Sequence, residues 1–412
     1  MELNTYLEEY ARLLVYSGLN VKPGQVVVCR APVETVELVR KVVKKAYEKG
    51  ASNVLVKYND EVVSHERYKN AKDSVFENVY EHDICFLNDT AKEKACYLTL
   101  VGDDPDLMSD VDPKRMSTYS KVFRSKTKYW RKQLDFMECQ WCIGAVATPA
   151  WAKKVYPELN ENEALEKLWK AIFEMTRIHG DSVQNWEKHK QSFEKKVQLL
   201  NEMKIQSFHY QNSLGTDLIV EMPKGYIFAG GGSFLNDGTY YFPNMPTEEV
   251  FSCPKRSGVH GKLVASLPLC HNGAMIEDFY FVFENGKVVD FDAKKGKEVL
   301  QSILDTDEGS KYLGEIAFVP YGSPISLLNT IFYETLIDEN ASCHFALGTS
   351  YAECIEGGLE MSEEELLAHE ANQSFTHVDF MVGTDDLSIV AKCEDGKEVP
   401  IFVNGKYTQL FD

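Results

Sequence analysis

Short apolar runs alternate with longer amphipathic segments in the first part of the chain. The runs QVVVCRA at 25–31 and SNVLVKYND at 52–60 are rich in β-branched residues and predict two strands. Between them, VETVELVRKVVKKAYEKG at 33–50 has apolar residues at helical spacing, Lys in its last turn and Gly50 as a stop. This strand–helix–strand order predicts a βαβ unit and therefore a parallel sheet.

The same alternation continues toward residue 200. HDICFLND at 82–89 and QWCIGAVATP at 140–149 are interpreted as further strands. The segments at 160–180 and 181–203 have helical periodicity, and the second is long and heavily charged. These elements predict an α/β domain with a parallel sheet over residues 1–200.

The pattern changes near Lys204, where strand-like segments follow one another directly. Two Asn-Gly pairs, Asn285-Gly286 and Asn404-Gly405, lie between such segments and predict hairpins. We therefore predict a domain boundary at 185–205 and a strand-rich α+β domain over residues 201–412 that carries the active site. The strands expected there lie within 207–213, 216–225, 261–269 and 279–293.

Composition and charge narrow the range of partners. The chain of 412 residues is 44% hydrophobic, which is ordinary for a globular protein of two or three domains. Its formal net charge of −19 disfavours nucleic acid and anionic membranes as partners. That charge would attract a metal ion or a peptide amino terminus; the alternative is that it only keeps the protein soluble.

Features of targeting and redox chemistry point to the cytoplasm. The first residues, MELNTYLEEYARLLVYSG, lack the basic segment and apolar core of a signal peptide. No apolar run is long enough to span a membrane. Ten Cys are scattered along the chain, which favours free thiols in a reducing compartment. We expect a cytoplasmic protein.

The run FTHVDFMVGT at 375–384 places two polar residues inside an apolar strand. On a strand, His377 and Asp379 point to one face, and Val378 and Phe380 point to the other. That arrangement suits chelation of one metal ion or a His–Asp hydrogen bond. The alternative is the exposed polar face of an edge strand, because an HxD pair alone is a weak motif.

Three further segments carry candidate ligands, each with a plainer alternative. Glu339 and His344 lie in LIDENASCHFALG, where His344 could equally be a core histidine with a backbone partner. The adjacent pair Glu248 and Glu249 lies between two prolines, and could hold a cation or form a solvated pair. Glu315 begins the apolar run EIAFVPYG, and could be a ligand or a solvated strand end.

Taken together, these weak signals gather in the C-terminal half. Carboxylates combined with imidazoles suit Zn²⁺, Co²⁺ or Mn²⁺. The set exceeds what one tetrahedral ion needs and suits two metal ions with a bridging carboxylate and a shared water. Its members are Glu249, Glu315, Glu339, His344, His377 and Asp379.

Four ordered motifs in this half resemble those of a known enzyme family. NMPTEEVF at 244–251, GEIAFVP at 314–320, DENASCHFALGTSY at 338–351 and THVDFMVGT at 376–384 are similar to motifs of the aminopeptidase T, aminopeptidase S and PepS family of metallo-aminopeptidases (M29). The resemblance covers about residues 210–412 and is looser before them.

The resemblance implies a set of metal ligands and an active-site tyrosine. Glu249 takes the ligand position in PTEEVF, Glu315 the position that bridges two metals, and Tyr351 the position of the tyrosine. The other implied ligands are Glu339, His344, His377 and Asp379. The resemblance also implies a homodimer that acts on short peptides with a free N-terminus.

The implied reaction is release of the N-terminal amino acid. Two divalent ions would activate a water, and the Tyr351 hydroxyl would help to stabilise the oxyanion. Either Glu248 or Glu315 would carry the proton to the leaving amine. Two alternatives stay open: a metal-dependent hydrolase of another amide, and a protein that holds metal without catalysis.

Two remaining motifs are interpreted as structural. CQWC (Cys139 and Cys142) lies on a strand-like run and lacks a second CxxC, so burial of both thiols is expected. FAGGGS at 228–233 lacks the GK[ST] ending of a phosphate loop, and predicts a turn or a close backbone approach to substrate. The chain has no HExxH, which excludes a helix-borne zinc protease of that kind.

Overall fold

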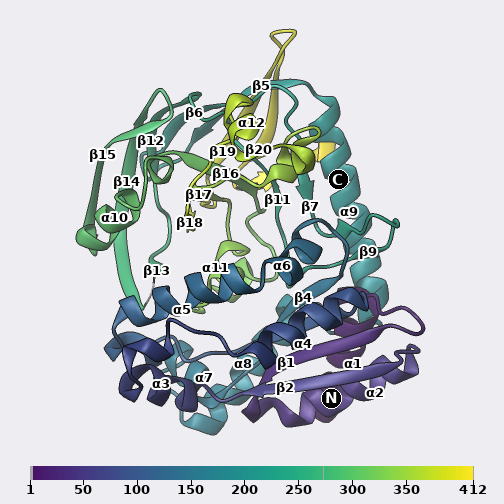
Figure 1. The fold of residues 1–412 in the computed structure, drawn as a ribbon. Helices are drawn as coiled ribbons and strands as arrows, with labels where there is room; N and C mark the ends of the chain where they lie inside the picture. Colours follow the sequence, from purple (N-terminus) through teal and green to yellow (C-terminus); the bar gives the residue numbers. More distant parts are fainter. Residues whose placement is uncertain (1–2, 272, 412) are drawn as a thin grey trace. The chain divides into compact units, whose positions relative to one another are not determined.

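The computed structural model describes residues 3–271 and 273–411. Two compact units emerge from its contacts: unit 1 comprises Met1–Glu187 and Gly232–Pro246, and unit 2 comprises Lys188–Gly231 and Thr247–Asp412. Figure 1 follows the chain through both. The predicted division into 1–200 and 201–412 stays a prediction, and residues 232–246, which lie in its second domain, group here with unit 1.

Unit 1 is built on a parallel sheet with the strand order β10-β4-β3-β1-β2. Strand β1 (Val26–Pro32) pairs in parallel with β2 (Asn53–Asn59), and α2 (Val36–Glu48) connects them. The predicted βαβ unit is therefore present. The other strands are β3 (Cys96–Val101), β4 (Trp141–Ala145) and the two-residue β10 (Asn244–Met245).

One predicted strand in unit 1 is wrong. The segment at 82–89 belongs to a helix, α4 (Glu81–Lys92), in which Ile84 and Ala91 are buried seven residues apart, a helical repeat. A short apolar run cannot be assigned by periodicity alone, and here the helical period decides. The strand in this part of the chain is β3, for which no element was predicted.

Several helices in unit 1 begin at a side-chain cap. Helix α8 (Glu161–Met175) starts with a capping box in which Asn160 and Glu163 satisfy each other's backbone N–H groups. The predicted long helix is α9 (Ser182–Glu202), which begins in unit 1 and continues into unit 2. Other helices are α1 (Leu3–Leu13), α3 (Glu61–Asn70), α5 (Pro113–Lys126), α6 (Lys128–Asp135) and α7 (Pro149–Val155).

Unit 2 contains a large antiparallel sheet, with the order β13-β14-β12-β6-β5-β19-β20-β21 and β15 beside β14. Asn285-Gly286 turns β14 into β15, and Asn404-Gly405 turns β20 into β21, so both predicted hairpins are confirmed. The strands are β5 (Ile205–Gln211), β6 (Asp217–Glu221), β12 (Val259–Val264), β13 (Leu269–His271), β14 (Ala274–Glu284), β15 (Lys287–Lys295), β19 (Ser388–Cys393), β20 (Glu398–Val403) and β21 (Lys406–Tyr407).

A smaller antiparallel sheet in unit 2 carries the candidate ligands. Its order is β18-β17-β16-β11-β7. The strands are β7 (Ala229–Gly230), β11 (Val250–Ser252), β16 (Leu313–Phe318), β17 (His344–Gly348) and β18 (His377–Met381). The register sets Glu315 opposite Ala346, and Ala346 opposite Asp379, so these residues form one row across the sheet.

Aromatic side chains attach the smaller sheet to the larger one. Phe318 contacts Phe208 with ring centroids 5.3 Å apart, and Phe380 contacts Phe281 at 5.2 Å. Each fully buried phenylalanine contributes about 1.5–3 kcal/mol to folding. Because side chains alternate along a strand, the residues next to Phe318 on β16 and next to Phe380 on β18 point to the opposite face of the sheet.

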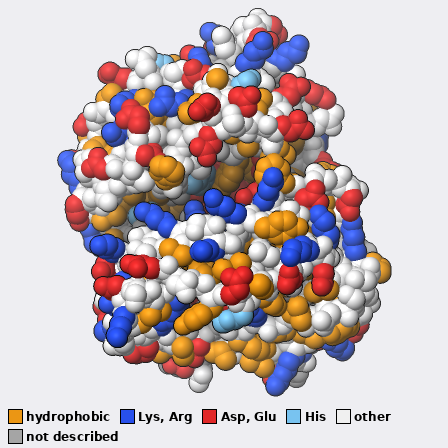
Figure 2. Space-filling view, viewed as in Figure 1, with side chains coloured by type: hydrophobic (Ala, Val, Ile, Leu, Met, Phe, Trp, Pro, Cys, Tyr) orange, Lys and Arg blue, Asp and Glu red, His pale blue; other side chains and the backbone are white. Residues whose placement is uncertain are grey.

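The visible surface carries many charged side chains. Figure 2 shows acidic and basic side chains interspersed over the visible face. Among the residues that the structure describes, none of the helices combines the length and the apolar character needed to cross a membrane.

Candidate metal centre

The candidate centre lies on the face of the smaller sheet opposite the aromatic core. Glu315, His344, His377 and Asp379 come from three adjacent strands, β16, β17 and β18. Ala317 and Ala346 lie on the same face, where their small side chains leave room between the larger polar ones. The polar residues at alternate positions of these strands are unfavourable to bury. The same alternation directs four ionisable side chains toward one region.

The first group of converging side chains is Glu249, Glu315 and His344, whose ligand atoms all lie within 4.8 Å of one another. Nε2 of His344 lies 3.0 Å from Oε2 of Glu249. The His344 side chain is 1% exposed and that of Glu249 12%. This group brings two carboxylates and an imidazole into a space that one cation would fill.

The second group is Glu315, His377 and Asp379, again within 4.8 Å. Nε2 of His377 lies 2.9 Å from Oε2 of Glu315 and 3.2 Å from Oδ1 of Asp379. Glu315 belongs to both groups. A carboxylate has two oxygens, so it can serve two neighbouring cations at once.

Backbone carbonyls fix the orientation of both imidazoles. Nδ1 of His344 lies 3.1 Å from the Ser342 carbonyl, and Nδ1 of His377 lies 2.8 Å from the Thr349 carbonyl. A carbonyl only accepts, so Nδ1 carries the hydrogen and Nε2 faces the carboxylates. Such a second partner is typical of metal-binding histidines.

Two atoms of the second group fit a bound cation better than any protein partner. Nε2 of His377 and Oδ1 of Asp379 are buried and lie 3.2 Å apart, yet among the described residues neither takes part in a well-directed hydrogen bond. Buried polar atoms are rarely left in this state. A divalent ion coordinated by both atoms would satisfy them, so the residues present fit the metal that this donor set favours.

The electrostatics of the group point the same way. Burial raises the pKa of Glu315, and burial followed by the charges of Asp379 and Glu249 raises the pKa of Glu339 well above its usual range. Burial alone would lower the pKa of His344, but the contact with Glu249 outweighs it and raises that pKa to about 9. Without a metal, protons compensate the crowded carboxylates; a cation would take the place of those protons.

Glu339 stands slightly apart from the two groups. It is the last residue of α11 (Thr335–Glu339), and it is absent from both sets of atoms within 4.8 Å. The charges of Asp379, Glu249 and Glu315 nevertheless act on its carboxyl group. It therefore faces the cluster from the helix side.

The adjacent glutamates Glu248 and Glu249 make different contacts. Glu249 contacts His344, whereas Oε2 of Glu248 lies 3.8 Å from Nε2 of His189 on α9. The backbone N–H of Glu248 donates to Oδ1 of Asn340 at 2.7 Å. This geometry agrees with the predicted choice of Glu249 over Glu248 as the ligand, and leaves that assignment a prediction.

Tyr351 lies beside the second group. Its ring centroid is 4.9 Å from that of His377 and 5.8 Å from that of Phe251. Although 45% of the residue is exposed, burial around the hydroxyl, reinforced by the charges of Glu315 and Asp379, raises the pKa of Tyr351 well above its usual value. The hydroxyl is therefore a neutral donor at physiological pH.

Two residues near the centre had not been identified from the sequence. Asn340 lies within the motif DENASCH, beside Glu339, so its position was the one signal that could have found it. Nε2 of His189 lies 2.9 Å from the Thr247 carbonyl, but His189 occurs in a charged helix and carries no sequence signal. Contacts between distant segments identify both.

The two remaining motifs make structural contacts. Cys139 and Cys142 are buried free cysteines, as expected. In FAGGGS, Gly230 pairs with Val250, and a Cβ on Gly230 would lie 2.6 Å from the Glu249 carbonyl oxygen. The glycine thus allows a close backbone approach, but to the segment that carries Glu249; an approach to substrate stays a prediction.

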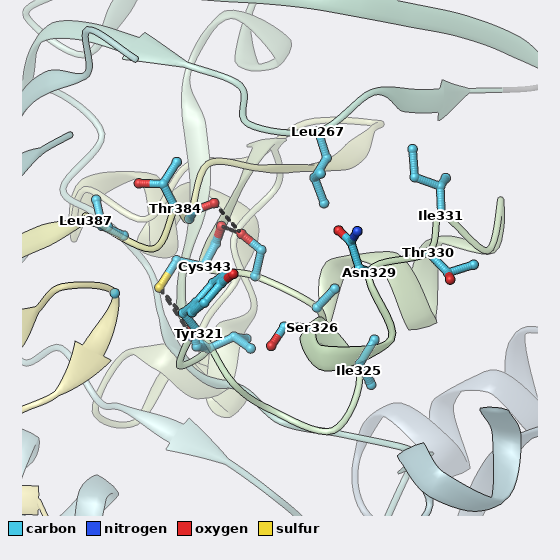
Figure 3. A pocket seen from close by; sticks show the side chains of 15 residues that line it. Leu267, Tyr321, Ile325, Ser326, Asn329, Thr330, Ile331, Cys343, Thr384 and Leu387 are labelled. Atoms are coloured by element: carbon cyan, nitrogen blue, oxygen red, sulfur yellow. Dashed lines mark hydrogen bonds between the residues drawn. The ribbon is translucent and has the colours of Figure 1, made fainter. Parts of the chain in front are cut away.

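A separate pocket of about 270 Å³ lies in unit 2 next to the start of β17 (Figure 3). It is lined largely by apolar side chains, including Leu267, Val319, Ile325 and Leu387, with Cys343 in its wall. None of the described residues that line it is Asp, Glu, Lys, Arg or His. It therefore lacks the groups needed to hold a metal or activate water.

Carboxylates and imidazoles that converge on one face of a sheet are typical of metal-dependent hydrolases. The family model described as thermophilic metalloprotease (M29) matches residues 3–407, and the chain belongs to this family. The match extends the motif resemblance from the C-terminal half to nearly the whole chain.

Individual relatives agree with the family. The chain is 43% identical over 402 residues to aminopeptidase AmpS of Bacillus subtilis (strain 168), covering 97% of this chain and 98% of that protein. It is 40% identical over 402 residues to aminopeptidase 2 of Geobacillus stearothermophilus, covering 97% of this chain and 97% of that protein. The solved structure of wild-type AmpT from Thermus thermophilus superposes with a TM-score of 0.92 at 35% identity, covering 99% of this chain and 100% of that one.

These matches confirm the sequence-based assignment to the aminopeptidase T, aminopeptidase S and PepS family. The protein is a metallo-aminopeptidase, a hydrolase of the M29 family. Membership also implies that it uses divalent metal and acts on peptides. Helices combined with several sheets agree with the predicted mixture of α and β structure.

Proposed function

We propose that the protein releases N-terminal amino acids from short peptides at a centre of two divalent ions, Zn²⁺, Co²⁺ or Mn²⁺. The observation that carries this proposal is that Glu315 belongs to both groups of converging ligand atoms. One site would use Glu249, Glu315 and His344; the other would use Glu315, His377 and Asp379, with Glu339 alongside. When bound, such ions would lower the pKa of a water molecule and polarise the scissile carbonyl.

The chain's own residues would bind and orient the peptide and move its protons. The hydroxyl of Tyr351, which stays protonated, would donate a hydrogen bond to the carbonyl oxygen as negative charge develops there. Because Glu315 would direct one oxygen to each ion, Glu248 is left as the proposed carrier of the proton to the leaving amine. Nε2 of His189, which faces the Thr247 carbonyl at 2.9 Å, lies 3.8 Å from Oε2 of Glu248 and would help to keep that carboxylate in place.

We further propose that the enzyme works in the cytoplasm as a homodimer. Free cysteines, most of them buried, support a reducing compartment, since no disulfide is formed among the described residues. The homodimer rests on the family resemblance alone, and gel filtration with light scattering would test it.

Metal removal combined with a blocked substrate tests the proposal. The protein is dialysed against a chelator, and its action is followed on a tripeptide with a free amino terminus and on the N-acetylated counterpart. Activity on the free peptide should vanish and return with Co²⁺, Zn²⁺ or Mn²⁺, and the acetylated peptide should stay intact. Turnover that survives full metal removal, or equal cleavage of both peptides, would contradict the proposal.

A further inference from the structure

Asn340 connects two segments that carry proposed ligands and lie far apart in the sequence. Its side chain is fully buried, with 0% of the residue exposed. Oδ1 accepts the N–H of Glu248 at 2.7 Å, and Nδ2 donates to the carbonyl of Leu336 at 2.8 Å. Glu248 precedes the ligand Glu249, and Leu336 lies in the helix that ends at Glu339.

We propose that Asn340 is a positioning residue that sets the relation between the Glu249 and Glu339 carboxylates, and so tunes the affinity of the centre for its metal ions. This inference rests on the function proposed above. Asn340 itself touches neither metal nor substrate in this scheme. It acts through the backbones of the two segments.

The two hydrogen bonds of Asn340 would oppose the repulsion between neighbouring carboxylates. Glu249, Glu315, Glu339 and Asp379 crowd together, and like charges in a buried setting push their segments apart. Helix α11 has only five residues and cannot hold its position by its own hydrogen bonds. Leu336 is the second residue of this helix, so its carbonyl is among the last four, which lack a partner within the helix, and the Asn340 side chain donates to it.

The segment that carries Glu249 is held at a second point by His189. Nε2 of His189 contacts the Thr247 carbonyl at 2.9 Å, one residue before the N–H that Asn340 holds. The carbonyl and the N–H of the single peptide group between Thr247 and Glu248 are thereby held from two different elements. The direction in which Glu249 leaves the backbone follows from these two contacts.

Three variants test the inference, and one of them is a matched control. Asn340→Ala removes both hydrogen bonds. Asn340→Asp keeps the shape and the acceptor for Glu248, but it replaces the amide donor to Leu336 with a carboxyl group, which donates only while protonated. Asn201→Ala is the control, because Asn201 makes the same two kinds of bond, at 2.7 Å and 3.0 Å, but to Phe228 and not to Glu248 or to helix α11.

The measurement is the dissociation constant for Mn²⁺ and Zn²⁺, obtained by titration calorimetry on the metal-free full chain. Asn340→Ala should bind about 10–100-fold more weakly, the usual effect of losing an outer-shell partner. Asn201→Ala should bind as the unaltered protein does. Asn340→Asp is the sharpest variant, because an added negative charge alone would strengthen cation binding, whereas a lost cross-link weakens it; we expect about threefold weaker binding or more.

The outcomes separate this inference from the proposed function. If the unaltered protein binds no ion, the proposed centre itself is wrong. The same follows if the His344→Ala variant binds the ions as tightly as the unaltered protein does. If the unaltered protein binds metal and Asn340→Asp binds as tightly or more tightly, the positioning role is wrong. An Asn340→Ala variant that fails to fold leaves the isosteric Asp variant to decide.

Discussion

Two clusters of carboxylates, one in each unit, differ in a way that separates a metal centre from an acidic patch. The Glu315 cluster of unit 2 comprises Glu249, Glu315, Glu339, His344, His377 and Asp379. The Glu61 cluster of unit 1 comprises Glu34, Glu61, Asp103 and Asp104, which follow strands β1, β2 and β3 at the carboxyl edge of the parallel sheet. Burial raises the pKa of both Glu61 and Glu315.

What differs is the partner of each carboxylate. Oε2 of Glu61 accepts the backbone N–H of Asp104 at 2.9 Å, and its other influences are carboxylates. Glu315 instead meets an imidazole whose orientation is fixed by a backbone carbonyl. Burial alone yields a protonated carboxyl group; burial together with directed imidazoles yields a donor set for a divalent ion.

The largest expected effect comes from changing the central carboxylate of each cluster. Glu315→Gln removes the carboxylate common to both ligand groups, and we expect kcat/KM on a free tripeptide to fall by about 10³-fold or more, since several kcal/mol of transition-state stabilisation depend on both ions. The corresponding Glu61→Gln change should leave kcat/KM within about twofold. Steady-state kinetics at saturating metal provide the measurement.

Circular dichroism and the metal content of each variant serve as controls for Glu315→Gln. A folded Glu315→Gln variant that keeps both ions and full activity would refute the bridging role. If Glu315→Gln unfolds whether or not metal is added, a structural metal site is favoured over a catalytic one.

Tyr351→Phe should have the next largest effect. The change removes one hydroxyl beside His377 and leaves every proposed ligand in place. Loss of an oxyanion donor typically costs 10²–10³-fold in kcat, so a fall of roughly 10²-fold is expected, with the dissociation constant for Mn²⁺ unchanged. If Mn²⁺ affinity falls as steeply as kcat, Tyr351 supports the centre instead of the reaction.

Metal binding should stabilise the Glu315 cluster and not the Glu61 cluster. At a free metal concentration of about 100 times the dissociation constant, linkage predicts about 2.7 kcal/mol of added stability. Hydrogen exchange should slow in β16, β17 and β18 when Zn²⁺ is added, and stay unchanged in β1, β2 and β3. Equal protection of both sheets would mean that the ions bind elsewhere or unspecifically.

The sequence indicated the candidate ligands of the centre better than the contacts that hold them in place. The alternation in THVDF placed His377 and Asp379 on one face, and the structure has this arrangement in β18. Five of the six predicted ligands fall into two groups within 4.8 Å, and Glu339 lies beside them. Local periodicity accounts for the pairing of His377 with Asp379, because strand geometry fixes which residues share a face, whereas the choice of Glu249 rests on the family resemblance.

The parts that escaped prediction depend on distant contacts. Nothing in the order of strands indicates that β11 pairs with β16, since this pairing joins residues 250 and 318. Asn340 and His189 matter only through the segments they contact. The wrong strand at 82–89 has the same origin, because packing decided between two periods that eight residues could not distinguish.

The smallest expected effect tests the Glu61 cluster through the pH dependence of its stability. Burial, with the charges of Asp103 and Asp104, raises the pKa of Glu61 from 4.5 to about 7. Below pH 4.5 the group is protonated in both the folded and unfolded states and adds no pH dependence. As pH rises from 4.5 to 7, the unfolded chain releases this proton first, so the folded state loses stability over that window.

Glu61→Gln removes this titration while keeping an acceptor for the Asp104 N–H. Relative to the unaltered protein, the variant should therefore gain stability between pH 5 and pH 8, by on the order of 1 kcal/mol once solvent screening of a half-exposed group is allowed for. Urea unfolding of both proteins at the two pH values measures the difference, and pairwise subtraction cancels other titrating groups. A gap that stays constant or narrows with rising pH would show that Glu61 ionises normally, and the two clusters would then differ in burial as well as in their histidines.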